Sequence, residues 1–167
     1  MKETKRASFL FEMRNFIFGA EDSLVSTVGL LSGVAIAGMD RRDIIVTGAV
    51  LVFVEAFSMA VGTYLAERAT EPDKAQSDST SKRDILGSLV MLGSYFGAGF
   101  IPLLPYIIAK PENALAYSVV AALAALFLLG VVSAEILKTN IKRNALRMVL
   151  MGGCAIGLGV FVGTWLA

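Results

Sequence analysis

Three side chains within otherwise apolar stretches are of types that bind metal ions: the carboxylates of Asp22 and Glu55 and the thioether of Met59. The sequence has no histidine, which excludes a Ser-His-Asp triad, imidazole ligands and histidine proton relays. Carboxylates alone suit magnesium or calcium, whereas an added thioether favours iron(II) and its neighbours. Carboxylates also take up protons when a metal leaves, so the same residues can couple metal movement to proton movement.

These side chains lie within five long apolar runs of the 167-residue chain. Each run has about 23 to 25 residues, roughly 35 Å as a helix, which is enough to cross a hydrocarbon core of ~30 Å. The chain is 56% hydrophobic and 17% charged, whereas soluble domains are nearer half apolar and a quarter charged. The sequence therefore predicts one all-α integral membrane domain over residues 1–167, with spans at Phe16–Gly38, Ile44–Ala66, Ile85–Ala109, Ala114–Leu137 and Ala145–Ala167.

The remaining segments are polar and short. Met1–Arg14 is charged and amphipathic, and we interpret it as a cytosolic lead-in helix and not as a signal peptide. Glu67–Asp84 is rich in Ser, Thr and Asp, so we expect a mobile loop there.

The overall composition excludes several other classes of function. The net charge of +1 gives no reason to expect a nucleic-acid partner, and the one cysteine, Cys154, excludes a disulfide framework within the chain. We predict no enzymatic activity.

The distribution of basic residues predicts the orientation in the membrane. Most of the fifteen lysines and arginines lie in the N-terminal segment, between the second and third spans, or around the start of the fifth. The exceptions are Arg41, Arg42 and Lys110. We therefore expect a cytosolic N-terminus and an external or lumenal C-terminus.

Orientation brings the candidate ligands to one depth. Asp22 lies six residues into the first span, roughly 9 Å from the cytosolic edge, and Met59 lies seven residues, roughly 10 Å, from the same edge of the second. Glu55 is one turn further in on the Met59 face. A charge at mid-bilayer costs about 2.5–3.5 kcal/mol on insertion scales, so such groups line a pathway or pair internally. The pattern predicts a metal site of Asp22, Met59 and Glu55, with packing of Met59 and structural hydrogen bonds of the carboxylates as the alternatives.

Further polar and small residues extend this hypothesis. Pathway or proton-coupling roles are expected for Glu21, Ser26, Glu67 and Glu135. The small-xxx-small pair Gly29–Gly33 predicts a close helix contact, either at the seam of a homodimer or within one chain. Pro102 and Pro105 are expected to kink or break the outer part of the third span.

Four segments resemble the vacuolar iron transporter family. Phe18–Ser26 resembles the first-helix motif FGxNDGLVS, and Glu55–Tyr64 resembles the second-helix motif around SMxxGEY. Phe96–Tyr106 resembles the third-helix motif GxxIPLLPY, and Leu128–Gly130 with Arg143–Leu150 is similar to the closing pair of helices. The resemblance covers nearly the whole chain in order.

The resemblance implies a five-helix protomer, a ten-helix homodimer with a pathway between its copies, and exchange of iron(II) or manganese(II) for protons away from the cytosol. No permanently bound cofactor is implied; the metal is the substrate, and the bilayer, protons and a second copy are the partners. Asp22 matches the family's transport aspartate and Met59 its transport methionine.

The chain departs from the family pattern by having Glu21 for Asn, Ser23 for Gly and Thr63 for the GEY glutamate, and Glu55 adds a carboxylate. It resembles short prokaryotic members, which implies a cell-membrane location, and it lacks the cytosolic metal-binding helices. The alternatives to a carrier are a small membrane scaffold and a channel-like pore.

Overall fold

The computed structural model of the protein describes residues 2–70 and 78–167, which form five α-helices and no strand. Each helix has a segment that is long and apolar enough to cross a membrane. The prediction of an all-α fold with five spans is therefore confirmed. The helices are α1 (Lys2–Ile36), α2 (Arg41–Thr70), α3 (Asp78–Ile108), α4 (Pro111–Leu137) and α5 (Ile141–Leu166).

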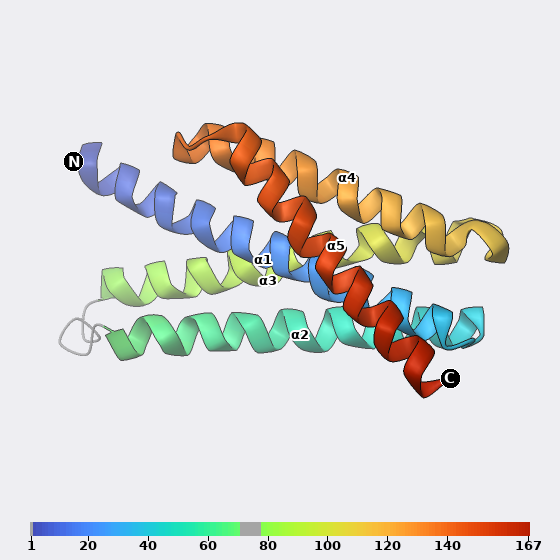
Figure 1. Ribbon diagram of the computed structural model, residues 1–167. Coiled ribbons are helices and arrows are strands. Elements are labelled where there is room, and N and C mark those ends of the chain that lie inside the picture. The colour runs from blue at the N-terminus through green and yellow to red at the C-terminus, as the bar shows by residue number, and fades with distance from the viewer. Residues whose placement is uncertain (1, 71–77) are drawn as a thin grey trace.

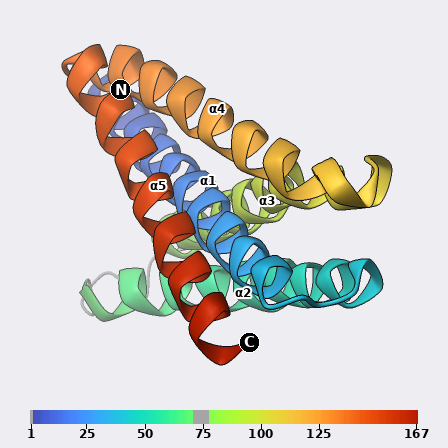
Figure 2. The ribbon, with the colours of Figure 1, turned by 45° about the vertical axis from the view of Figure 1, so that its right-hand side comes forward.

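Helix α1 is the centre of the bundle. It contacts each of the other four helices, most extensively α3 and α5. Figure 1 shows α5 crossing in front of α1, with α4 above it and α2 below it. Figure 2 shows the same central position from a second direction. Leu24, Val28 and Leu31 of α1 are accordingly almost fully buried. A helix surrounded in this way can present different faces to different neighbours.

The helix connections alternate between two ends of the bundle. Figure 1 places the N-terminus, the facing ends of α2 and α3 and the α4–α5 turn at one end, and the C-terminus at the other. Apart from Arg41, Arg42 and Lys110, the lysines and arginines of the described residues lie in the segments at this N-terminal end. The arrangement therefore concentrates positive charge at one end of the bundle.

Local signals account for where the helices begin and end. Pro111 occupies the start of α4, where its missing N–H removes no helix hydrogen bond. The side-chain oxygen of Asn140 accepts a hydrogen bond of 3.1 Å from the Arg143 backbone N–H at the start of α5. The α1–α2 turn passes through Gly38 at φ +81°, a conformation that favours glycine.

Helices α2 and α3 are longer than the predicted spans. The prediction of a loop over Glu67–Asp84 is wrong at both ends, because α2 continues to Thr70 and α3 begins at Asp78. Residues such as Glu67, Arg68 and Ala69 are good helix formers, so the helix continues beyond the apolar segment. The rest of the expected loop, residues 71–77, lies outside the described residues.

Two prolines lie inside α3, yet the helix runs on to Ile108. Of the two expected outcomes at Pro102 and Pro105, a kink or a break, the break does not occur. The hydroxyl of Ser118 in α4 donates a 2.6 Å hydrogen bond to the Pro102 carbonyl. At the end of α3, Arg41 donates to the carbonyls of Tyr106 and Ile107 at 2.6 and 2.5 Å. Side chains from neighbouring helices thus satisfy carbonyls in this region.

The glycines of α1 pack against α5 of the same chain. A Cβ added at Gly29 would lie 3.1 Å from the Ala155 carbonyl oxygen, and one at Gly33 would lie 2.8 Å from that of Gly159. Conversely, a Cβ at Gly159 would overlap the Gly29 carbonyl oxygen, and one at Gly163 would overlap that of Gly33. The assignment of Gly29 and Gly33 to a dimer seam is therefore wrong, because α5 occupies that surface. Contact within one chain, the alternative interpretation of the pattern, is what the structure has.

Candidate metal site

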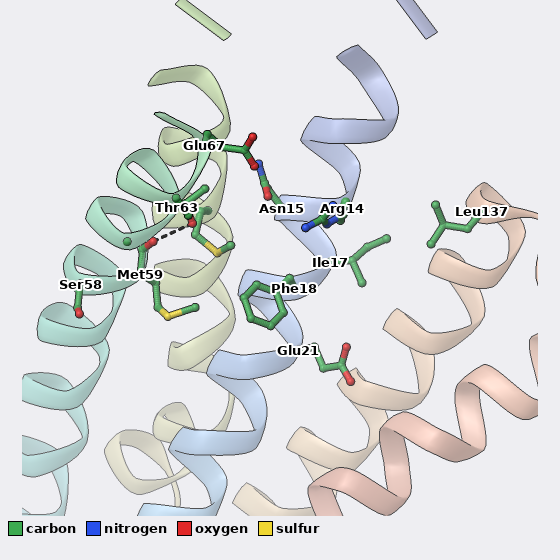
Figure 3. Close-up of a pocket in the computed structure, with 13 residues that line it drawn as sticks. Arg14, Asn15, Ile17, Phe18, Glu21, Ser58, Met59, Thr63, Glu67 and Leu137 are labelled. Carbon is green, nitrogen blue, oxygen red and sulfur yellow. Dashed lines mark hydrogen bonds between the residues drawn. The ribbon is translucent and has the colours of Figure 1, made fainter. Parts of the chain in front are cut away.

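A pocket of about 620 Å³ opens between α1 and α2 near the N-terminal end of the bundle (Figure 3). Its lining combines carboxylate, amide, hydroxyl, guanidinium and thioether groups with apolar side chains. The lining residues are Arg14, Asn15, Ile17, Phe18, Glu21, Ser58, Met59, Gly62, Thr63, Ala66, Glu67, Met91 and Leu137. The pocket thus holds both hard oxygen donors and soft sulfur donors, the mixture that suits divalent transition metals.

Helix periodicity explains the α1 side of the pocket. Arg14, Phe18 and Glu21 recur at intervals of three and four residues, so they share one face of the helix. Asn15 is 6% exposed, and its side-chain nitrogen has no hydrogen-bond partner among the described residues. A buried amide without a partner is costly, so this side of the pocket favours a polar occupant such as water.

The α2 side contributes Met59 and, one and two turns further along, Thr63 and Glu67. Met59 is half-buried, and Thr63 Oγ1 donates a 2.8 Å hydrogen bond to its carbonyl. In Figure 3 the Met59 side chain points toward Phe18, and Glu67 points toward Asn15. Glu21 lies on the other side of Phe18. The thioether and the Glu21 carboxylate therefore line one pocket with an aromatic ring between them.

A polar network lies beside the pocket, at Glu55, one turn before Met59 on α2. Tyr95 of α3 donates a 3.0 Å hydrogen bond from its hydroxyl to Glu55 Oε2. The same hydroxyl lies 2.8 Å from the Ser26 hydroxyl of α1, and Ser23 donates to the Tyr95 carbonyl at 2.6 Å. The carboxylate of Glu55 is therefore tied to α1 through a side chain of α3.

Negative charge concentrates at this level of the bundle. Asp22 lies close enough to Glu55 for the two charges to interact, and Glu21 interacts electrostatically with Asp22 and with Arg147 of α5. Among the described residues, no group of three or more His, Cys, Asp or Glu side chains could hold a metal ion. The described part of one chain supplies a few acidic donors and a thioether but no complete acidic cage.

The comparisons with known proteins agree with this architecture. The profile of the VIT family matches residues 13–86 and 70–164, which together cover most of the chain. The chain belongs to the VIT family. It is 26% identical over 166 residues to "Vacuolar iron transporter homolog 4" of Arabidopsis thaliana, covering 93% of this chain and 82% of that protein. It is 28% identical over 168 residues to "Vacuolar iron transporter homolog 5" of Oryza sativa subsp. japonica, covering 87% of this chain and 76% of that protein.

The family resemblance predicted from the motifs is therefore confirmed. The relatives are named as transporters, so the VIT family membership agrees with the prediction that the chain is a metal-transporting membrane protein and not an enzyme.

The predicted site residues of this VIT family member fall into three groups. Met59 lines the pocket with Glu21 and Glu67. Asp22, Glu55 and Ser26 do not line it; Asp22 interacts electrostatically with Glu55, and Ser26 is hydrogen-bonded to Tyr95. Glu135 is exposed near the end of α4 and belongs to neither group. The sequence placed Glu135 at the end of a span, but it could not show whether the side chain faces the pocket or away from it.

Sequence reasoning missed three residues of this region: Asn15, Met91 and Tyr95. Met91 and Tyr95 are on α3, which the motif analysis treated only around its prolines. A signal was present for Tyr95, because a hydroxyl within an apolar span needs a hydrogen-bond partner. Nothing in the sequence indicated that its partner is Glu55.

Proposed function

We propose that this protein carries iron(II) or manganese(II) across the membrane, out of the cytosol and in exchange for protons. The observation that carries the proposal is the pocket in which the Met59 thioether lies with the carboxylates of Glu21 and Glu67, beside the pair Asp22 and Glu55. The names of the VIT family relatives support iron as a substrate. Acidic donors attract a divalent cation, and the thioether favours a transition metal over magnesium or calcium.

In this proposal Asp22 and Met59 bind the metal, and Glu55 is a further ligand or a proton acceptor. Glu21, Glu67 and Ser26 line the route to and from them. A carboxylate that releases its metal can bind a proton, so one set of residues serves both directions of the exchange. The metal is a transported substrate and does not remain bound.

A homodimer would complete the coordination. One chain offers no group of three acidic, histidine or cysteine side chains for a metal among its described residues. The face of α1 and α2 around the pocket includes Phe18 and Ser58, which are exposed. A second copy placed against this face would double the number of carboxylates and thioethers and cover exposed aromatic surface.

The distribution of charge supports the proposed orientation in the membrane. The pocket opens near the end of the bundle that carries most of the lysines and arginines, and such an end faces the cytosol in most membrane proteins. The C-terminus would then be external. On this basis the pocket is the cytosolic entrance.

Transport by purified protein in liposomes tests the proposal. A metal-sensitive dye inside the vesicles reports uptake of iron(II) or manganese(II), and a pH-sensitive dye reports proton flux. A proton-coupled carrier gives metal uptake that increases with an opposing proton gradient, together with metal-stimulated proton flux. A pore gives metal flux without proton coupling, and a scaffold gives neither, so either result contradicts the proposal.

A further inference from the structure

Tyr95 connects three helices at the level of the acidic residues. Its side chain is fully buried in α3. Its hydroxyl reaches Glu55 Oε2 of α2 at 3.0 Å and Ser26 Oγ of α1 at 2.8 Å. Its own carbonyl accepts a 2.6 Å hydrogen bond from Ser23 of α1. The tyrosine is thus held at both its backbone and its hydroxyl.

Close approach of α3 to α1 and α2 makes this arrangement possible. A Cβ added at Gly99, one turn after Tyr95, would lie 2.7 Å from Ser23 Oγ and 2.6 Å from a methyl carbon of Val52. The glycine therefore permits the helices to approach to the distance at which the Tyr95 hydroxyl spans the gap between Glu55 and Ser26. The missing side chain at Gly99 thus leaves room for the side chains of Ser23 and Val52 against α3.

The donors and acceptors fix the direction of the hydrogen bonds. An ionised carboxylate only accepts, so the Tyr95 hydroxyl must donate to Glu55. Its oxygen is then free to accept from Ser26, which gives a chain that runs from Ser26 through Tyr95 to Glu55. Glu55 Oε2 is engaged in this chain, and the tyrosine leaves Oε1 for another partner.

We propose that Tyr95 is a positioning residue, which holds the Glu55 carboxylate in the orientation that presents Oε1 to the transported metal. Groups behind a metal ligand orient it, and losing one weakens metal binding because the ligand must then be ordered when the metal arrives. This inference rests on the proposed function, in which Glu55 is a ligand. It adds a residue on α3 to a site that the sequence had assigned to the first two spans.

The test compares Tyr95→Phe with Tyr106→Phe in liposome transport of manganese(II). Tyr106 is a matched control: it is a buried tyrosine on the same helix, and its hydroxyl donates to the Leu31 carbonyl of α1, at 3.5 Å, and not to a carboxylate. Tyr95→Phe is expected to raise KM about tenfold, the factor expected for losing a hydrogen bond to a charged group, and to leave the maximal rate within about twofold. Tyr106→Phe is expected to leave both parameters near the wild-type values.

A double-mutant cycle with Glu55→Gln shows whether Tyr95 acts through Glu55. If it does, adding Tyr95→Phe to Glu55→Gln has little further effect on KM or on manganese(II) affinity measured by calorimetry. Additive effects overturn the inference, as does a KM for Tyr95→Phe equal to that of Tyr106→Phe.

If Tyr95→Phe does not fold, Ser26→Ala provides a second test, because it removes the donor to the Tyr95 oxygen. This variant is expected to raise KM about threefold, since the loss is of the same kind but weaker. An unchanged KM overturns the inference. Absence of uptake by the wild-type protein overturns the proposed function itself, a result distinct from failure of the Tyr95 variant alone.

Discussion

Helix α1 meets α5 and α2 in opposite ways. Against α5 its backbone is in contact at Gly29 and Gly33, where even a single added Cβ would meet a backbone oxygen of the other helix. Against α2 it leaves a pocket of about 620 Å³ lined by Arg14, Glu21 and other polar groups. One helix therefore has two different stretches. The sealed stretch, around Gly29 and Gly33, is closed by α5, and the open stretch, around Arg14 and Glu21, lines the pocket.

The difference shows that, in a small membrane protein, the contacts that stabilise the fold and the polar groups of a site can lie on different surfaces of one helix. In lipid there is little hydrophobic drive between helices, so close backbone packing through small residues holds them together. The α1–α5 crossing provides such packing where the glycines of the two helices meet. The α1–α2 side can then remain open, with acidic and thioether groups directed into space and not into a tight contact.

The largest expected effect is on the open side. Asp22→Asn keeps the size and polarity of the side chain but removes its charge, so metal transport in liposomes should fall to near background. The thermal unfolding temperature should stay close to that of the wild type, since Asp22 is only half-buried and Asn has nearly the same shape. Full activity of this variant would end the hypothesis that Asp22 binds the metal.

The second prediction asks which stretch of α1 meets a second copy. In a Cys154→Ala background, a cysteine introduced at Phe18, on the exposed face beside the pocket, should form crosslinked dimers in the membrane. The native Cys154, exposed on α5, should crosslink less in the wild-type protein. Efficient crosslinking from Cys154 alone would move the dimer interface to α5.

The third prediction concerns the sealed stretch. Gly159→Ala should lower the free energy of unfolding by about 1–3 kcal/mol, because its Cβ would overlap the Gly29 carbonyl and the helices would have to separate. Gly157→Ala is the control: on the same helix its Cβ meets nothing within 4 Å, so the change should be within about 0.5 kcal/mol or slightly stabilising. Denaturation in detergent compares the two, and equal stabilities would mean that the crossing is looser than the structure indicates.

The smallest expected effect is on selectivity. Met59→Leu keeps volume and apolarity, so it should cost less than about 1.5 kcal/mol of stability. Loss of the thioether should reduce the preference for iron(II) or manganese(II) over magnesium in competition assays. Met91 lines the same pocket, so Met91→Leu measures any contribution of a second thioether. Unchanged selectivity in Met59→Leu would assign that methionine to packing.

Sequence patterns predicted the number of spans and singled out the carboxylates inside them, because both depend on local composition. A run of apolar residues long enough to cross a bilayer is a helix whatever its neighbours are. A carboxylate within such a run is costly wherever it lies, so Asp22 and Glu55 could be recognised without knowing their partners. The Gly29–Gly33 spacing likewise predicted a close contact, but it could not tell a contact within one chain from one between two chains.

The sequence by itself determined that this is a five-helix membrane protein of the VIT family, since length, hydropathy and motif order suffice for that. Only the tertiary structure decided that α5 covers Gly29 and Gly33, that Glu135 lies apart from the pocket, and that Tyr95 is hydrogen-bonded to Glu55. The physical reason is that each of these facts depends on the rotation and crossing of one helix against another. Hydropathy does not encode that rotation: it arises from the close fit of small and large side chains between helices.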